Sequence, residues 1–124
     1  MDPITHVLFS AILFNKLDPA LVFGSVLPDL DHIYSYLKGN LRSYRSRTPL
    51  HELPALSFLI AISSFLNPSL SLGLISHAVL DFITGDTRPF YPFHKGVVRF
   101  NLPAKLKVLL AVIVWAIGLA IILL

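Results

Sequence analysis

Apolar residues fall in runs of helical length along this chain, and short polar or proline-containing breaks separate the runs. Counting from one break to the next predicts helices over residues 3–14, 19–27, 33–37, 53–66, 70–84 and 102–124. The stretch 85–101 is polar and aromatic, and we expect it to be a loop. The fold class predicted from this pattern is all-α.

Proline residues that follow a capping side chain mark where the helices begin. Asp2–Pro3 and Asp18–Pro19 each place an aspartate at the N-cap and a proline at the first helical position. Asn67–Pro68 turns the chain between two long apolar runs. These breaks predict two antiparallel helical hairpins, one on each side of a basic loop.

The last helix is long enough to cross a membrane. Residues 108–124 carry no charge, and the whole stretch 102–124 makes about 23 residues, or roughly 34 Å of helix. Arg99, Lys105 and Lys107 precede it, so the positive-inside rule predicts that this end faces the cytoplasm of a prokaryotic cell, with the helix in the inner membrane. The alternative is a helix buried in a protein core.

Composition agrees with a membrane protein. Charged residues make up 14% of the chain, whereas about 25% is usual in soluble domains. At 124 residues the chain makes one unit, which we divide into a helical metal-site domain over 1–101 and the transmembrane helix over 102–124. The chain has no cysteine, so a metal site would use histidine and carboxylate ligands.

His77 and Asp81 are the first candidates for such a site. They lie four residues apart in an apolar run, which places both side chains on one face of a helix, one turn apart. An imidazole and a carboxylate in this position can bind one metal ion. The alternative is a core histidine hydrogen-bonded to its neighbouring carboxylate.

The hairpin topology brings further candidates to the same level. In each hairpin the first helix runs away from one end of the bundle and the second helix runs back to it. All seven candidates therefore lie at that end: His6, Asp29, Asp31, His32, His51, His77 and Asp81. Ionisable groups in apolar helices are costly unless they are paired, hydrated or bound to a metal, and a shared metal site would satisfy them together. Basic residues lie at this end, which predicts a site on the cytoplasmic side.

Several of these residues have simpler interpretations. Asp29 and Asp31, in the first turn after Pro28, could merely complement the helix dipole. Glu52 is either a partner of the site, a general base or a solvated residue of a first turn. Arg47 suits bidentate contact with an anionic head group.

The order of these segments resembles the YdjM-like, LexA-regulated, membrane-bound metal-dependent hydrolases. The segments that carry the resemblance are Thr5-His6, Gly24 to His32, Arg47 with His51, Ser76 to Asp81, Thr84-Gly85 and Tyr91-Pro92-Phe93. More distantly, the chain is similar to helical zinc-dependent phospholipase C and nuclease proteins, which also use a His-x-x-x-Asp pair.

The resemblance implies a helical, membrane-embedded protein with a divalent-metal hydrolase site. Carried over, it implies metal ligands at His6, Asp29, His51, His77 and Asp81, followed by Asp31 and His32. The chain departs from the family pattern where Ser46 replaces a histidine and Glu52 replaces a serine. If the family's histidine at the position of Ser46 is a metal ligand, this chain would hold one metal fewer or use Glu52 as a ligand instead.

Three functions remain open after this reading. The first is a hydrolase with one or two divalent ions, zinc before manganese or another transition metal, acting on a phosphoester or lipid-type substrate at the membrane face. Its candidate catalytic residues are Asp31, Glu52 and Arg47. The second is a membrane protein with a structural or carried metal, and the third is a lipid- or partner-binding adaptor. We expect membrane lipids and an anionic or lipid-linked substrate as partners, no nucleic acid, and leave a homo-oligomer open.

Overall fold

Capping side chains start the two hairpins as the sequence predicts. Asp2 Oδ1 accepts a hydrogen bond of 2.9 Å from the Thr5 N–H. Asp18 Oδ1 accepts one of the same length from the Leu21 N–H, and this bond lowers the pKa of the Asp18 carboxyl. Asn67 caps the helix that follows it in the same way. The proline after each cap has no N–H, so the first helical position leaves no backbone donor without a hydrogen-bond partner.

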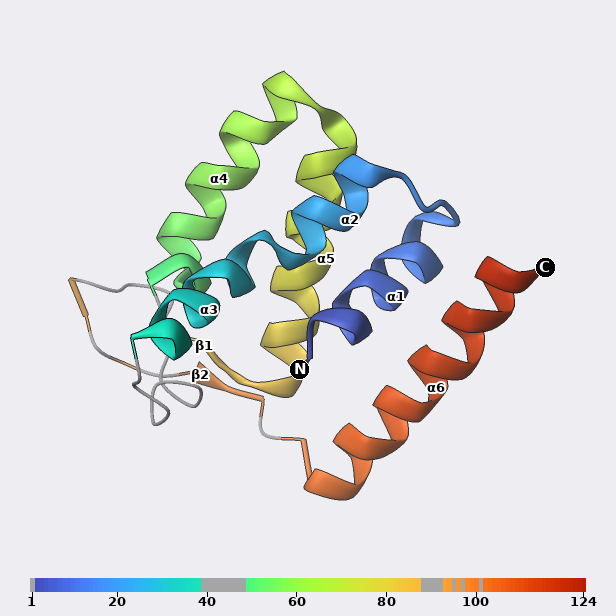
Figure 1. Ribbon diagram of the computed structural model, residues 1–124. Helices are drawn as coiled ribbons and strands as arrows, with labels where there is room; N and C mark the ends of the chain where they lie inside the picture. Colours follow the sequence, from blue (N-terminus) through green and yellow to red (C-terminus); the bar gives the residue numbers. More distant parts are fainter. Residues whose placement is uncertain (1, 39–48, 88–92, 95, 97, 101) are drawn as a thin grey trace.

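A computed structural model describes the chain except residues 1, 39–48, 88–92, 95, 97 and 101. The described elements are, in order, α1 (Pro3–Phe14), α2 (Pro19–Val26), the 3-10 turn η1 (Leu27–Asp29), α3 (Leu30–Leu37), the 3-10 turn η3 (Pro49–His51), α4 (Leu53–Leu66), α5 (Pro68–Thr84), β1 (Asp86–Thr87), β2 (Val98–Arg99) and α6 (Ala104–Leu123). Figure 1 shows α1 with α2 and α4 with α5 as two hairpins, and α6 beside α1. The predicted all-α fold, with two hairpins and a C-terminal helix, is confirmed.

The two hairpins meet where α2 crosses α5, the most extensive contact between helices. Gly24 and Gly73 face each other there. A Cβ atom on Gly24 would overlap the backbone carbonyl of Leu70, and one on Gly73 would overlap the carbonyl oxygen of Leu21. Small residues that let helix backbones touch are typical of helix packing inside membranes. The crossing brings the backbone of α2 directly against the face of α5.

Gly73→Ala is expected to lower the free energy of unfolding by about 1–3 kcal/mol, the usual cost of overpacking. The added methyl group would meet backbone atoms, which cannot rotate away. Thermal unfolding in detergent measures the loss. Gly96→Ala is the matched control, because its methyl group would meet only the exposed and movable ring of His94. An equal loss in both variants would contradict the close α2–α5 crossing.

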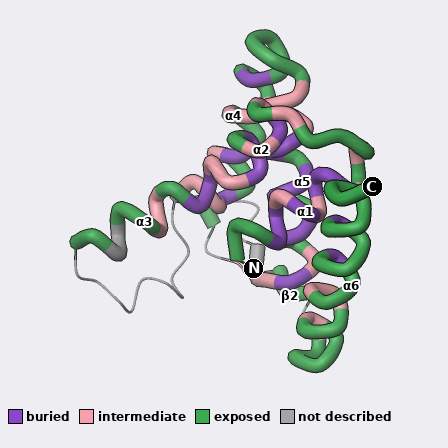
Figure 2. Tube along the Cα trace, turned by 45° about the vertical axis from the view of Figure 1, so that its right-hand side comes forward, coloured by how far each residue is buried: buried purple, intermediate pink, exposed green. Residues whose placement is uncertain are grey.

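The C-terminal helix lies on the outside of the bundle and packs on α1. The indole N–H of Trp115 donates a hydrogen bond of 3.0 Å to Thr5 Oγ1. Only Val114 and Gly118 of α6 are buried, and Figure 2 shows almost its whole length exposed. Among the described residues α6 alone is long and apolar enough to span a membrane. Its exposure rules out the alternative of a helix buried in the protein core.

The structure differs from the prediction in the loop after α5 and at several helix boundaries. Residues 85–101, expected as a loop, contain the short antiparallel pair in which Asp86 lies opposite Arg99 and Thr87 opposite Val98. Two-residue strands leave no alternation pattern to read. The second helix ends at Val26 and continues as the 3-10 turn η1. Three helices begin at other residues than predicted: α3 at Leu30 rather than at residue 33, α5 at Pro68 rather than at residue 70, and α6 at Ala104 rather than at residue 102.

Candidate metal centre

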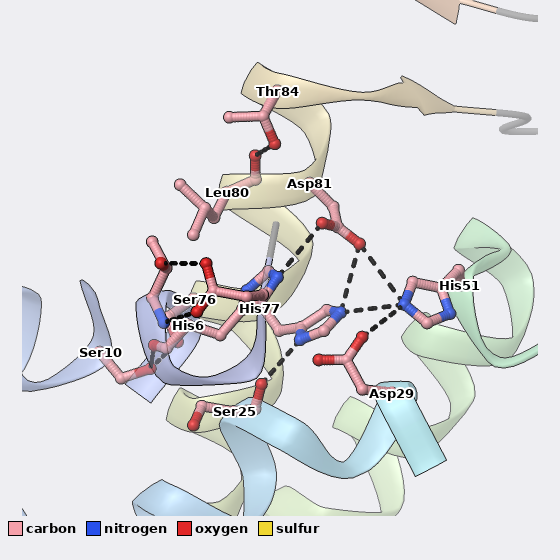
Figure 3. A network of polar contacts seen from close by, with 12 residues as sticks. His6, Ser10, Ser25, Asp29, His51, Ser76, His77, Leu80, Asp81 and Thr84 are labelled. Carbon is pink, nitrogen blue, oxygen red and sulfur yellow. Dashed lines mark hydrogen bonds and ion pairs between the residues drawn. The ribbon is translucent and has the colours of Figure 1, made fainter. Parts of the chain in front are cut away.

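Side chains from five elements converge between the two hairpins. The first turn of α1 supplies His6, η1 supplies Asp29, η3 supplies His51, and α5 supplies His77 and Asp81 (Figure 3). The start of α3 adds the last two of the seven predicted residues, Asp31 and His32. The structure therefore brings all seven together, as the hairpin topology predicts.

Four of their atoms form a tight group. His77 Nε2 lies 3.3 Å from His51 Nε2 and 3.2 Å from Asp81 Oδ2. His51 Nε2 lies 3.6 Å from Asp81 Oδ2 and 3.2 Å from Asp29 Oδ1. Ligands around a tetrahedral zinc ion with bonds near 2.0–2.1 Å are separated by roughly 3.3–3.4 Å. His51 Nε2, His77 Nε2 and Asp81 Oδ2 are separated from one another by distances close to that geometry, and Asp29 Oδ1 adjoins this trio at His51 Nε2.

The protonation of His77 follows from its other ring nitrogen. His77 Nδ1 lies 2.7 Å from the backbone carbonyl oxygen of Ser25, and both residues are fully buried. A carbonyl only accepts hydrogen bonds, so Nδ1 carries a proton, and whenever the ring is neutral its Nε2 presents a lone pair to the group. This is the usual way in which a protein fixes the tautomer of a histidine that binds a metal. The α2–α5 crossing places the Ser25 carbonyl at this point.

Acceptors outnumber donors among the four atoms. With neutral histidines, the four atoms themselves carry at most one proton, on His51 Nε2, which faces the His77 lone pair and oxygens of Asp29 and Asp81. His51 Nδ1 lies 3.7 Å from Asp31 Oδ1, on the side away from the group. A cation between the four atoms would satisfy all of them together. The donor set of two imidazoles and two carboxylates suits zinc or a similar divalent metal.

His6 extends the group on one side. Its ring stacks on that of His77, with centroids 3.9 Å apart, and its Nε2 lies 3.4 Å from Asp81 Oδ1. Asp81 thus turns one oxygen to His6 and the other to His51 and His77. His6 Nδ1 and Asp29 Oδ2 are buried and have no hydrogen-bond partner among the described residues. Unsatisfied buried atoms at this point fit a site that holds an ion.

The residues divide into three overlapping sets that could each hold a metal. They are His6 with Asp29 and His77, Asp29 with His32 and His51, and His51 with His77 and Asp81. Because the sets share Asp29, His51 and His77, they describe one centre with room for one ion or for two neighbouring ions. The metal-ligand roles predicted for these residues remain predictions, and so does the zinc.

The start of α3 closes the site on the side of His51. The ring of His32 lies 4.6 Å from that of His51, and burial lowers the pKa of His32 below its ordinary value. Asp31 Oδ2 accepts a hydrogen bond of 3.0 Å from the Leu50 N–H. Both residues therefore face η3, and Asp31 orients the loop that carries His51.

Two expectations for other polar residues need correction or fall outside the structure. The expectation that Glu52 is solvated is wrong, because this residue is only 3% exposed where the chain passes from η3 into α4. Burial beside His51 favours the reading of Glu52 as a partner of the site. Arg47, predicted to contact an anionic group, and Ser46 lie outside the described residues. His94 is exposed, and its Nδ1 accepts a bond from the Gly96 N–H.

The sequence did not lead us to predict a role for the buried hydroxyl groups between α1 and α5. Ser10 and Ser76, both fully buried, share a short hydrogen bond between α1 and α5. Each hydroxyl also lies within hydrogen-bond distance of a backbone carbonyl oxygen, Ser10 of that of His6 and Ser76 of that of Gly73, so one hydroxyl donates to its carbonyl and the other donates across to it. Buried serines at helix contacts were the available signal, since such hydroxyls commonly join helices inside membranes. They fix α1 against α5 and so place His6 on His77.

Comparison with known proteins gives one match. The model of a family described as YdjM inner membrane protein matches residues 1–124. No curated protein and no solved structure matches the chain.

Proposed function

The chain belongs to the YdjM inner membrane protein family, and from this premise we propose that it is a membrane-bound hydrolase that depends on a divalent metal. One observation carries the proposal. The Nε2 atoms of His51 and His77 face each other at 3.3 Å with carboxylate oxygens of Asp29 and Asp81 beside them. This is a set of ligands at metal-binding distances in a protein with few charges.

The residues around the four atoms support a hydrolytic role. A divalent ion bound there would act as a Lewis acid on a phosphoryl or carbonyl oxygen. Glu52, buried next to His51 in the chain, is proposed as the base that takes a proton from the attacking water. Asp31 is proposed as a positioning residue, because it lies beside His51 Nδ1 and holds the Leu50 N–H. Arg47 is proposed to bind the anionic part of the substrate.

The substrate that fits this site is a phosphoester or another lipid-type ester carried by the membrane. The protein is an inner membrane protein, and α6, which is long and apolar enough to span the membrane, packs on α1, the helix that carries His6. Lys105 and Lys107 begin α6, so by the positive-inside rule we propose that this end, and access to the site, face the cytoplasm.

A structural metal site is the second candidate, and the number of ligands favours it. If Asp29 joined His51, His77 and Asp81 on one ion, that ion would have four protein ligands, and a tetrahedral zinc ion with four protein ligands has no open position for a substrate. In that case the metal would tie η1, η3 and α5 together. Asp29 from one hairpin and His77 from the other would be joined through it.

A chelation experiment separates the two functions. The purified protein in phospholipid vesicles is assayed against phosphomonoesters, phosphodiesters and phospholipids, before and after treatment with a chelator. We expect hydrolysis that stops on chelation and returns with zinc or manganese, while the helical circular dichroism and the unfolding temperature change little. Loss of the fold on chelation, without any hydrolysis before it, would instead support the structural site.

A further inference from the structure

Helix α3 carries an exposed apolar stripe. Its members recur with the spacing of one helix face, and their side chains are 42%, 52%, 59% and 78% exposed at Leu30, Ile33, Tyr34 and Leu37. Figure 2 shows α3 extending away from the other helices, across the direction of α6. A helix that only supported the metal centre would have no need of an outward apolar face.

The rest of the same helix belongs to the metal centre. His32 lies opposite the stripe on the helical wheel and contacts the His51 ring, and Asp31, at the side, binds the Leu50 N–H. The helix also follows directly on η1, which supplies Asp29. Eight residues therefore connect an outward apolar surface to the side chains that close the site.

Positive charge lies next to the stripe. Lys38 follows α3 directly, is exposed, and holds its Nζ atom 4.6 Å from the centroid of the Tyr34 ring. In the sequence Arg42, Arg45 and Arg47 come next. An amphipathic helix with a tyrosine on its apolar face and cations at its end is the pattern of a helix that lies in a membrane interface with anionic lipids.

We infer that α3 lies in the interface of the membrane, with its apolar stripe on lipid and its other side on the metal centre. The occupant of the stripe is the anionic lipid surface, because α6 already holds this protein in a membrane and the charge beside the stripe is positive. The position of α3 stands independently of any catalytic activity. The position of α3 also places the site next to lipid head groups. This second step rests on the proposed hydrolase function, and it makes a head-group ester the substrate class.

Quenching of tryptophan by brominated lipids tests the inference. Trp115 is the only tryptophan of the chain, so the double variant W115F/L37W reports on α3 alone. The full chain is placed in vesicles of phosphatidylcholine and phosphatidylglycerol with bromine near the head group or near the bilayer centre. We expect the shallow bromine to reduce the emission at least twofold and the deep bromine to reduce it less.

The unmodified protein is the matched control, because Trp115 lies near the middle of α6 and its emission should respond more to the deep bromine. Absence of quenching at the α3 position would overturn the inference, and a dependence of its emission on protein density alone would assign the stripe to a second copy of the chain. Vesicles without phosphatidylglycerol should quench less, and equal quenching would overturn the choice of an anionic surface. Adding D81A should leave the α3 signal unchanged, so failure of the metal site and failure of this inference are distinguishable.

Discussion

The D81N variant is expected to lose more than ~100-fold of the hydrolytic rate while it stays folded in the membrane, because losing an outer partner of a metal ligand already costs about 10–100-fold and Asp81 is proposed as a ligand itself. Asp81 Oδ2 lies within 3.6 Å of His51 Nε2 and His77 Nε2, and Oδ1 lies 3.4 Å from His6 Nε2. An amide keeps the shape of the side chain but removes its negative charge. Phosphoester turnover in vesicles, with helical circular dichroism alongside, measures the effect.

D18N is the control for this substitution. Asp18 is also a carboxylate beside a helix, but it caps α2 at the end of α1 away from His6 and contacts Lys16. We expect D18N to hydrolyse the substrate at nearly the rate of the unmodified protein. Equal turnover in D81N would remove Asp81 from the reaction and leave the structural metal site as the better description.

His77→Ala is expected to abolish metal binding. His77 is completely buried, its Nδ1 is fixed by the Ser25 carbonyl, and its Nε2 lies within 3.3 Å of two other candidate ligands. Removing it deletes one of the four atoms in the group and leaves His51 and Asp81 without a common partner. Titration with cobalt, whose absorption reports tetrahedral coordination, should show more than a ~100-fold loss of affinity.

Two further variants keep the His77 experiment interpretable. H94A removes an exposed histidine that takes no part in the group, and we expect it to bind cobalt as the unmodified protein does. H77Q keeps most of the side-chain volume, so its failure to bind would not reflect an empty space in the core. Equal binding in H77A and H94A would contradict the site.

The sequence was sufficient to predict the hairpins and the meeting of the seven polar residues. Asp-Pro and Asn-Pro breaks mark where helices start, and the direction of each helix then follows from chain continuity. His77 and Asp81 were recognisable because their spacing equals one helical turn in an otherwise apolar run. These signals are local, and each can be read from a few residues.

Features that depend on contacts between distant segments could not be read in the same way. Glu52 has the position of a solvated residue in a first turn, but the folded chain buries it where η3, which packs on η1, passes into α4. The Ser25 carbonyl that orients His77 is a backbone group, so its role cannot be predicted from the residue type. Its position depends on the contact between Gly24 and Gly73, two glycines that in sequence alone are equally consistent with helix ends.

The metal content of the purified protein tests the central claim most directly. The unmodified protein, H77A, D81A and H94A are purified in detergent without chelator, resupplied with zinc or manganese, dialysed and analysed by mass spectrometry for bound metal. We predict one or two ions per chain in the unmodified protein and in H94A, and none in H77A and D81A. No bound metal in the unmodified protein after resupply would contradict the metal centre and leave these histidines and aspartates as a polar core network.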